Sequence, residues 1–407
     1  MLPLTAMLKI LTFSTLYPNS VEPHHGIFTE TSLRQQLRHH AMQSIVVAPV
    51  PWFPSRAGLF GRYGRYARVP REESRNGVRV LHPRYLNPPG VGMYLAPWSL
   101  FHAARRPIDA LLAQGEDFDV IDAHYFYPDG VAATMLGRHY GKPVIVSALG
   151  SDITQLPSHA WPRRLIRQAA GQAHAMISVC ETLKNDMIRL GLPGERIHAL
   201  RNGVDLELFH PEPRAQARAA FNMVDYTLLS VGHLIERKGH DKVIGALPQL
   251  PGVRLLIVGD GPERAGLLAL CRDLGVQDRV RFLGLLNQAQ LRSCYNAADA
   301  LVLASNREGW ANVLLEAMAC GAPALASNVG GTAEVVRCHA AGLLLRTNCA
   351  AGVADAVRRL RADPPTRDAT CAYARQHSWH ATTLAQFNLF AGAAGLPADH
   401  VRQRPAA

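Results

Sequence analysis

The chain has 407 residues, more than one hydrophobic core ordinarily supports, so its length predicts two domains. Hydrophobic residues make up 48% of the sequence and charged residues 18%, a globular composition that excludes an intrinsically disordered chain. The formal net charge is +11, and Arg56–Arg84 alone contains eight arginines against two glutamates. This basic excess leaves three interpretations: a solvated loop face, attraction to an anionic membrane surface or a lipid diphosphate, or nucleic-acid binding. No nucleic-acid-binding motif accompanies the charge, so we expect no nucleic-acid partner.

Targeting, membrane-spanning and metal-binding signals are not found in the sequence. No run of about 18 apolar residues occurs, so no membrane-spanning helix is predicted. The apolar N-terminus lacks a small-x-small cleavage site, and we expect Leu8–Phe13 to be a buried first strand rather than part of a signal peptide. Seven cysteines without a Cys-x-x-Cys pair predict reduced, mostly buried thiols in a cytoplasmic protein. The histidines show no HExxH-like spacing, so no metal site is predicted.

Short β-branched runs alternate with amphipathic segments from the beginning of the chain. Stretches such as Thr29–His40 and Glu181–Leu190 have a helical pattern, and the alternation predicts a doubly wound, largely parallel sheet. Residues 55–90, rich in Gly, Arg, Tyr and Pro, are expected to form a long irregular insertion. The strands expected in this first series are Leu8–Phe13, Ser44–Pro49, Val78–Leu81, Val120–Ala123, Val144–Ala148, Ala175–Val179 and Ile197–Leu200.

The same alternation then restarts, which predicts a second domain of the same kind. Asn202–Asp205, followed by two prolines, is the expected hinge. We therefore expect an α/β fold with an N-terminal Rossmann-like domain over residues 1–203 and a C-terminal one over 204–380. A helical segment over 381–407 is expected to return to the N-terminal domain, with Trp379 as a packing anchor. The second series of strands is Tyr226–Gly232, Val253–Val258, Val280–Leu283, Ala300–Leu303, Ala322–Ala326 and Gly342–Leu345.

The loop after the predicted strand Ala300–Leu303 has features of an anion-binding site. Ligands bind beyond the carboxyl ends of strands in open parallel sheets. Gly309 permits a tight turn in this loop, and Asn312 is a good N-cap for the helix that follows. The N–H groups of Val313 and Leu314 would then point from the helix N-terminus toward a phosphate.

Glu308 and Glu316 stand eight residues apart around this helix start. With a nucleoside diphosphate on the helix end, Glu316 would lie near a ribose and Glu308 near an attached sugar. Carboxylates suit both positions because each accepts two hydroxyl hydrogen bonds. The alternative is a solvated helix carboxylate and an ordinary loop glutamate. It fits Glu316 poorly, because an acid within an apolar helical segment needs a partner.

The Glu-x7-Glu spacing and several other motifs together resemble the large retaining glycosyltransferase family 4. The resemblance extends along most of the chain and implies the GT-B fold, two Rossmann-like domains whose parallel sheets face each other across a cleft. The remaining motifs that carry it are His25–Phe28, Asp122–His124, Tyr127–Gly130, Gly150–Asp152, Asn202–Asp205, Glu236–Asp241, Val258–Glu263 and Gly330–Glu334.

The resemblance also implies roles for residues that would contact the diphosphate. Arg237 and Lys238 would supply positive charge to the leaving diphosphate in place of a metal ion; the alternative is surface solubility. Gly26 would stand where a side chain would collide with the diphosphate, or would be an ordinary turn glycine.

Further implied roles concern the sugar, the acceptor and the base. His124 would face the sugar across the cleft, or would be a structural histidine with satisfied hydrogen bonds. Asp152 would either hydrogen-bond the acceptor or brace the cleft. Gly259 and Gly261 would make room for the base or ribose, and Gly284 would line the base pocket.

The sequence departs from the family pattern at four positions. His233 stands where many members carry Arg, which predicts a weaker or pH-dependent phosphate contact. Leu149 replaces a frequent Arg or His and puts an acceptor or phosphate contact in doubt. Ala311 and Ala333 replace common prolines and change only the stiffness of their loops.

The resemblance implies a retaining glycosyltransferase that moves a hexose or acetamidohexose from a nucleoside diphosphate sugar to an acceptor hydroxyl. The donor would be a UDP- or GDP-sugar, with no tightly bound cofactor and no metal. A saccharide or lipid-linked saccharide in bacterial surface or exopolysaccharide synthesis is the expected acceptor, handled in the cytoplasm or on the inner face of the membrane. The alternatives are a nucleotide-sugar epimerase of the same fold and a non-catalytic protein that binds nucleotide sugars or the membrane surface.

Overall fold

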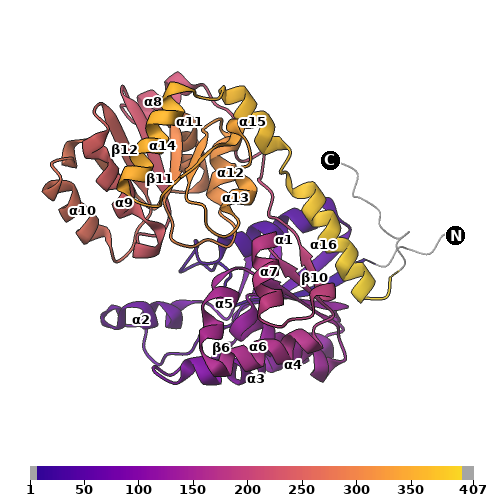
Figure 1. The fold of residues 1–407 in the computed structure, drawn as a ribbon. Helices are drawn as coiled ribbons and strands as arrows, with labels where there is room; N and C mark the ends of the chain where they lie inside the picture. Colours follow the sequence, from indigo (N-terminus) through magenta and orange to yellow (C-terminus); the bar gives the residue numbers. More distant parts are fainter. Residues whose placement is uncertain (1–6, 397–407) are drawn as a thin grey trace. The chain divides into compact units, whose positions relative to one another are not determined.

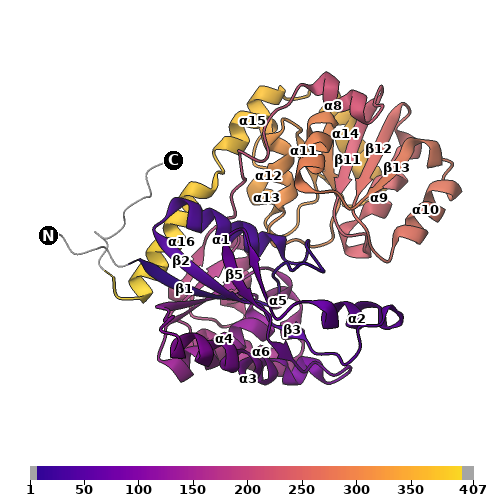
Figure 2. The same ribbon diagram turned by 180° about the vertical axis from the view of Figure 1, so that it is seen from behind.

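The computed structural model describes residues 7–396, which form two compact units. The first unit contains residues 7–201 and 380–396, and the second contains residues 202–379. Each unit is a sheet covered by helices on both faces (Figure 1, Figure 2). Within the described residues, no helix combines the length and the apolar character needed to cross a membrane.

The first unit is built on an eight-stranded sheet in the order β10-β9-β8-β7-β1-β2-β5-β4. All neighbouring strands are parallel except β4 and β5, which pair antiparallel. Strands β7 and β8 are buried along their whole length, as expected for central strands covered on both faces. The strands are β1 (Leu8–Phe13), β2 (Met42–Val47), β4 (Glu72–Arg75), β5 (Val78–Leu81), β7 (Val120–His124), β8 (Val144–Ala148), β9 (Ala175–Ser178) and β10 (Ile197–Ala199).

Two helical layers cover this sheet. Helices α3, α4 and α6 pack beside one another on one face, and α1 and α16 lie on the other (Figure 1, Figure 2). Phe387 and Phe390 of α16 join a core cluster with Leu8 and Ile10 of β1. The helices are α1 (Ile27–His39), α2 (Gly61–Arg68), α3 (Gly92–Ala113), α4 (Val131–Tyr140), α5 (Ser151–Thr154), α6 (Ala160–Gln172), α7 (Glu181–Arg189) and α16 (Trp379–Ala393).

The second unit has a six-stranded, fully parallel sheet in the order β13-β12-β11-β14-β15-β16. Leu228 of β11 and Leu255 of β12 share a core cluster with Val243 of α9 and Val353 of α14. The strands are β11 (Tyr226–Val231), β12 (Val253–Val258), β13 (Val280–Gly284), β14 (Ala300–Leu303), β15 (Ala324–Ala326) and β16 (Gly342–Leu344). The helices are α8 (Arg214–Ala220), α9 (His240–Ala246), α10 (Arg264–Asp273), α11 (Gln288–Ala297), α12 (Asn312–Ala319), α13 (Thr332–Val335), α14 (Ala350–Ala362) and α15 (Arg367–Arg375).

The segments that enter and leave the second unit lie side by side. Val204 and Ser378 form a parallel bridge, and the Val204 N–H donates to His377 O at 2.9 Å. A Cβ at Gly203 would lie 2.4 Å from Trp379 N, so the close approach requires glycine. Trp379 is 4% exposed, as a packing anchor should be.

Most of the predicted strands are present, but residues 55–90 are not the irregular insertion that was expected. They contain α2, the hairpin of β4 and β5, and β6 (Arg84–Tyr85), which pairs with β3 (Val50–Pro51). The hairpin adds two strands to the sheet edge, and its turn carries Asn76 and Gly77 with positive φ. The polar sequence Glu-Glu-Ser-Arg concealed β4 because this edge strand is largely solvated and has no apolar run.

Candidate active site

The candidate site of the second unit is formed by loops that follow β11, β12 and β14. These strands are direct neighbours in a parallel sheet, so their carboxyl ends meet at one edge. The loop after β11 carries His233, Arg237 and Lys238. The loop after β14 carries Glu308, and the sheet topology therefore brings together residues that lie about 70 positions apart in the sequence.

Glu308 is the centre of a charged cluster. Its side chain is almost fully buried, and its Oε1 accepts hydrogen bonds from Lys238 Nζ and Ser305 Oγ, each at 2.7 Å. The Arg237 Nη1 lies 3.9 Å from Glu308 Oε2 and donates to Arg307 O at 2.9 Å. Both cations are thus fixed beside one carboxylate, and the three groups together keep one net positive charge at the ends of the strands.

Backbone contacts of Gly330 and Gly331 hold the Glu308 loop in place. Gly330 has φ +53°, and a Cβ there would lie 1.8 Å from Glu308 O. The Gly331 N–H donates to Gly309 O at 3.0 Å. Any side chain at Gly330 would therefore displace the carboxylate loop. Gly330–Glu334 stands out in the sequence as a motif, but this role was not predicted from it; the signal was the Gly-Gly pair itself.

Glu316 has a buried partner that sequence reasoning missed. The hydroxyl of Tyr295, on α11, donates to Glu316 Oε2 at 2.8 Å. Tyr295 is fully buried, whereas the Glu316 side chain is partly exposed. Burial raises the pKa of Glu316 to about 7, and the bond from Tyr295 opposes that rise. The acid in an apolar helix does have the partner that its environment requires, supplied by a tyrosine 21 positions earlier.

The predicted N-cap of α12 is wrong. Asn312 is the first helical residue, and Ala311 occupies the cap position without a side-chain cap bond. The Asn312 Oδ1 instead accepts a long, 3.4 Å bond from Asn202 Nδ2. Leu314 N–H donates to Ala311 O at 3.1 Å, so this amide is already engaged, while Val313 is the second helical residue and partly exposed. The first turn therefore uses the Leu314 amide for its own backbone and does not leave it for a phosphate.

Gly259 and Gly261 are explained by the packing of two loops against each other. A Cβ at Gly259 would lie 1.9 Å from Gly232 O, and one at Gly261 would lie 2.4 Å from Leu234 O. His233 stands exposed between these two contact points. Gly284 closes β13 and accepts the Gly259 N–H at 2.9 Å. The glycines let the β12 loop lie directly on the β11 loop and hold His233 at the surface.

In the first unit, His124 ends β7 and is buried. Its Nε2 lies 2.9 Å from Asp122 Oδ2, and both side chains are at most 5% exposed. The contact satisfies one imidazole nitrogen within the unit, which favours the structural alternative for His124. The same contact fixes the orientation of the ring, and an oriented imidazole is also what a sugar contact needs.

Gly26 and Asp152 have strong structural explanations. Gly26 precedes α1 with φ +68°, and a Cβ there would lie 2.2 Å from the Leu16 carbonyl. Asp152 is fully buried and accepts from the backbone amides of Phe126, Leu149 and Gly150 at 2.7 to 3.2 Å. Two roles were predicted for Asp152, a hydrogen bond to the acceptor or bracing of the cleft. These internal hydrogen bonds favour the bracing role.

Each half of the chain matches a known protein family. Residues 212–377 match the family described as "Glycosyl transferases group 1", and residues 62–208 match "Glycosyltransferase Family 4". The chain is 31% identical over 261 residues to N-acetyl-alpha-D-glucosaminyl L-malate synthase of Bacillus anthracis, covering 62% of this chain and 68% of that one. It is 28% identical over 363 residues to a putative teichuronic acid biosynthesis glycosyltransferase of Bacillus subtilis, covering 86% and 89%.

Solved structures share the fold. Sucrose-phosphate synthase from Thermosynechococcus elongatus matches with a TM-score of 0.74 at 20% identity, covering 95% of this chain and 99% of that one. The Anabaena protein HepE in complex with UDP matches with a TM-score of 0.70 at 20% identity, covering 94% and 98%. Two parallel-sheet units with this site define an α/β protein of the GT-B class.

The chain belongs to glycosyltransferase family 4 and is a glycosyltransferase. The resemblance seen in the sequence and the GT-B fold are both confirmed. The comparisons do not favour the alternatives, an epimerase or a binding-only protein.

Proposed function

We propose that the protein transfers a hexose or acetamidohexose from a nucleoside diphosphate sugar to a hydroxyl of a saccharide acceptor, with retention of the anomeric configuration. The observation that carries this proposal is the Arg237–Lys238–Glu308 cluster at the carboxyl ends of β11 and β14. Residues 204–380 would bind the donor and residues 1–203 the acceptor. Of the segment 381–407, residues 381–396 would complete the acceptor domain, and 397–407 lie outside the described residues.

Arg237 and Lys238 act on the leaving group in this mechanism. Charge develops on the diphosphate oxygens as the glycosidic bond breaks, and two pre-oriented cations stabilise that charge without rearranging. Glu308 holds Lys238 at 2.7 Å through Oε1. Its Oε2 is left to accept a hydroxyl of the transferred sugar. Glu316, carried by α12, accepts from the ribose.

Related proteins support a surface-polysaccharide role and a uridine donor. The Bacillus subtilis relative is named for teichuronic acid biosynthesis, and HepE was solved with UDP and with UDP-glucose. We propose a UDP-sugar donor and a lipid-linked saccharide acceptor, handled at the inner face of the membrane. The basic segment Arg56–Arg84 supplies the charge for such a surface.

The donor assignment is tested by thermal stabilisation with a panel of UDP- and GDP-sugars, followed by transfer assays. We expect one base and one sugar to stabilise the wild type most, and Glu316→Ala to lose that response while remaining folded. Equal shifts from every nucleotide sugar, or none, would count against the donor site. Release of free sugar or of an epimer without an acceptor adduct would count against the transfer reaction.

A further inference from the structure

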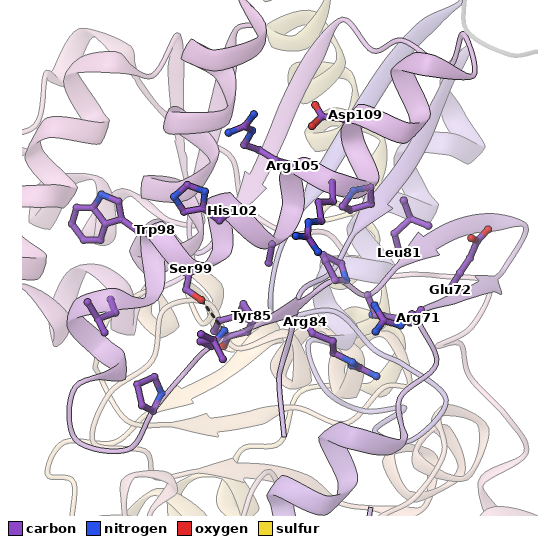
Figure 3. Close-up of a pocket in the computed structure, with 18 residues that line it drawn as sticks. Arg71, Glu72, Leu81, Arg84, Tyr85, Trp98, Ser99, His102, Arg105 and Asp109 are labelled. Atoms are coloured by element: carbon purple, nitrogen blue, oxygen red, sulfur yellow. Dashed lines mark hydrogen bonds between the residues drawn. The ribbon is translucent and has the colours of Figure 1, made fainter. Parts of the chain in front are cut away.

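A large cavity in the first unit lies between the β5–β6 segment and α3 (Figure 3). Its volume is about 1110 Å³. Small-molecule sites typically enclose about 300–1,000 Å³, so this cavity accepts more than a single sugar. Trp98, Ser99, His102, Arg105 and Asp109 enter it from α3, opposite residues of the β4–β6 region (Figure 3).

One end of the cavity is strongly basic. Arg71 and Arg84 line it, and within the described residues neither forms an ion pair with an acid. Arg84 Nη2 donates to Val69 O, but its Nη1 is buried and has no hydrogen-bond partner among residues 7–396. Burial lowers the pKa of Arg84, and the positive charges of Arg71 and Arg56 lower it further. An unpartnered buried guanidinium nitrogen among like charges calls for an anion.

The acidic side chains of the lining do not neutralise this end. Glu72 is bound to Arg79, whose Nε lies 2.7 Å from the Glu72 Oε1. Asp109 accepts from Tyr140 OH at 2.7 Å and lies toward Arg105, on α3. The His82 ring is buried, and its two nitrogens contact Ala48 O and Glu73. The basic end therefore keeps its positive charge.

Another part of the lining, next to the polar α3 side chain His102, is apolar and exposed. Leu86 is 61% exposed, Leu95 51% and Trp98 36%. Trp98 also stacks with Trp161 of α6, with ring centroids 6.1 Å apart, which extends the apolar surface. Clustered exposed apolar side chains beside a charged pocket are typical of a binding surface rather than of an ordinary solvated face.

We propose that this cavity binds the phosphorylated lipid that carries the acceptor, with the phosphate on Arg71 and Arg84 and the hydrocarbon chain along Leu86, Leu95 and Trp98. A nucleotide would satisfy the arginines and stack on Trp98, but it would leave the aliphatic side chains uncovered. A free saccharide would need neither the charge nor the apolar wall. The inference rests on the proposed function, because it assigns the carrier half of the proposed acceptor.

The test measures binding of geranylgeranyl diphosphate to the full chain by quenching of tryptophan fluorescence. We expect Arg71→Gln and Arg84→Gln each to weaken binding about tenfold or more, since each removes a charge-assisted contact. Arg272→Gln, which removes an exposed arginine from the second unit, is the matched control and should bind as the wild type does. Geranylgeraniol, which lacks the diphosphate, should bind at least as weakly as the variants.

Three results with the lipid probe would overturn this site: equal affinity for geranylgeraniol, displacement of the lipid by UDP, or unchanged affinity in a folded Arg71→Gln protein. A fourth would also overturn it: binding to phosphatidylglycerol vesicles that depends on the same arginines, with no preference for the diphosphate lipid. Because Arg71 is exposed, its variant keeps the test valid if Arg84→Gln does not fold. Stabilisation by UDP-sugars is measured in the same samples. If that response is absent while lipid binding persists, the proposed function fails and the lipid site stands.

Discussion

The two units use their motif residues differently. In the second unit, Lys238 and Glu316 reach the carboxyl edge of the sheet with part of each side chain exposed. In the first unit, His124, Asp129 and Asp152 are buried and take part in internal hydrogen bonds. Sequence motifs of equal prominence therefore leave side chains accessible to a ligand in one unit and hold loops together in the other. Burial and hydrogen-bond partners, which no motif displays, make the distinction.

The largest effect is expected at Lys238. Lys238→Ala removes a cation that would stabilise the leaving diphosphate, and we expect kcat to fall about 100- to 1,000-fold. The change also leaves Glu308 buried without its closest cation, which lowers stability. Initial-rate transfer assays and thermal unfolding measure the two effects.

The double variant Lys238→Ala/Glu308→Ala separates the two effects of this change. It should recover part of the stability, because no buried charge is left unpaired, and it should recover none of the activity. Recovery of transfer in the double variant would show that Lys238 acts only as the counter-ion of Glu308.

In the first unit, the substitution to compare with Lys238→Ala is Asp152→Ala. It leaves the amides of Phe126, Leu149 and Gly150 without their acceptor, and we expect it to lower the free energy of unfolding by about 2–4 kcal/mol. UDP-sugar affinity should not change, because the residue lies in the other unit. A stable Asp152→Ala protein with reduced acceptor use would instead assign Asp152 to the acceptor.

A smaller effect, on donor affinity, is expected from the protonation of Glu316 as the pH changes. Its pKa of about 7 means that the carboxylate, the form that accepts two ribose hydroxyl bonds, dominates only above neutral pH. We expect donor affinity to rise by up to about tenfold between pH 6 and pH 8. Tyr295→Phe removes the bond that lowers this pKa and should move the rise to higher pH. Titrations of donor Kd at several pH values measure both, and an identical profile in Tyr295→Phe would contradict the assignment.

The contribution of Glu316 to folding stability changes with pH in the opposite direction to donor affinity. The folded pKa of Glu316 is raised above its usual 4.5, so the folded chain holds this proton more tightly than the unfolded chain does. Its contribution to stability is therefore complete below about pH 4.5 and is lost as the pH rises toward 7. Glu316→Gln should remove that part of the pH dependence of unfolding.

The sequence predicted strand positions and the order of the motifs well because parallel strands buried on both faces are near-continuous apolar runs, as in β14 and in β12 after the exposed Arg254. It predicted β5 at Val78–Leu81 but could not predict β4, the charged edge strand that pairs with it, because Glu72–Arg75 lacks that pattern. At the candidate site it singled out Glu308 and Lys238, which the structure brings together. It missed Tyr295, which lies on another helix, since only the packing of α11 against α12 brings its hydroxyl to Glu316.

The smallest predicted effect concerns the helix cap that the sequence misplaced. Asn287 is a true N-cap: its side chain accepts from Gln290 N–H, and the Gln290 side chain accepts from Asn287 N–H. Asn287→Ala should lower the free energy of unfolding by about 1 kcal/mol, the usual cost of losing a cap. Asn312→Ala should cost less than about 0.5 kcal/mol, because Asn312 caps nothing and holds only a 3.4 Å contact with Asn202. Chemical denaturation of the two variants side by side measures the difference. Equal losses of stability would mean that Asn312 supports the start of α12 in some way other than capping. A loss of donor affinity without a loss of stability would instead support the predicted role of Asn312 in phosphate binding.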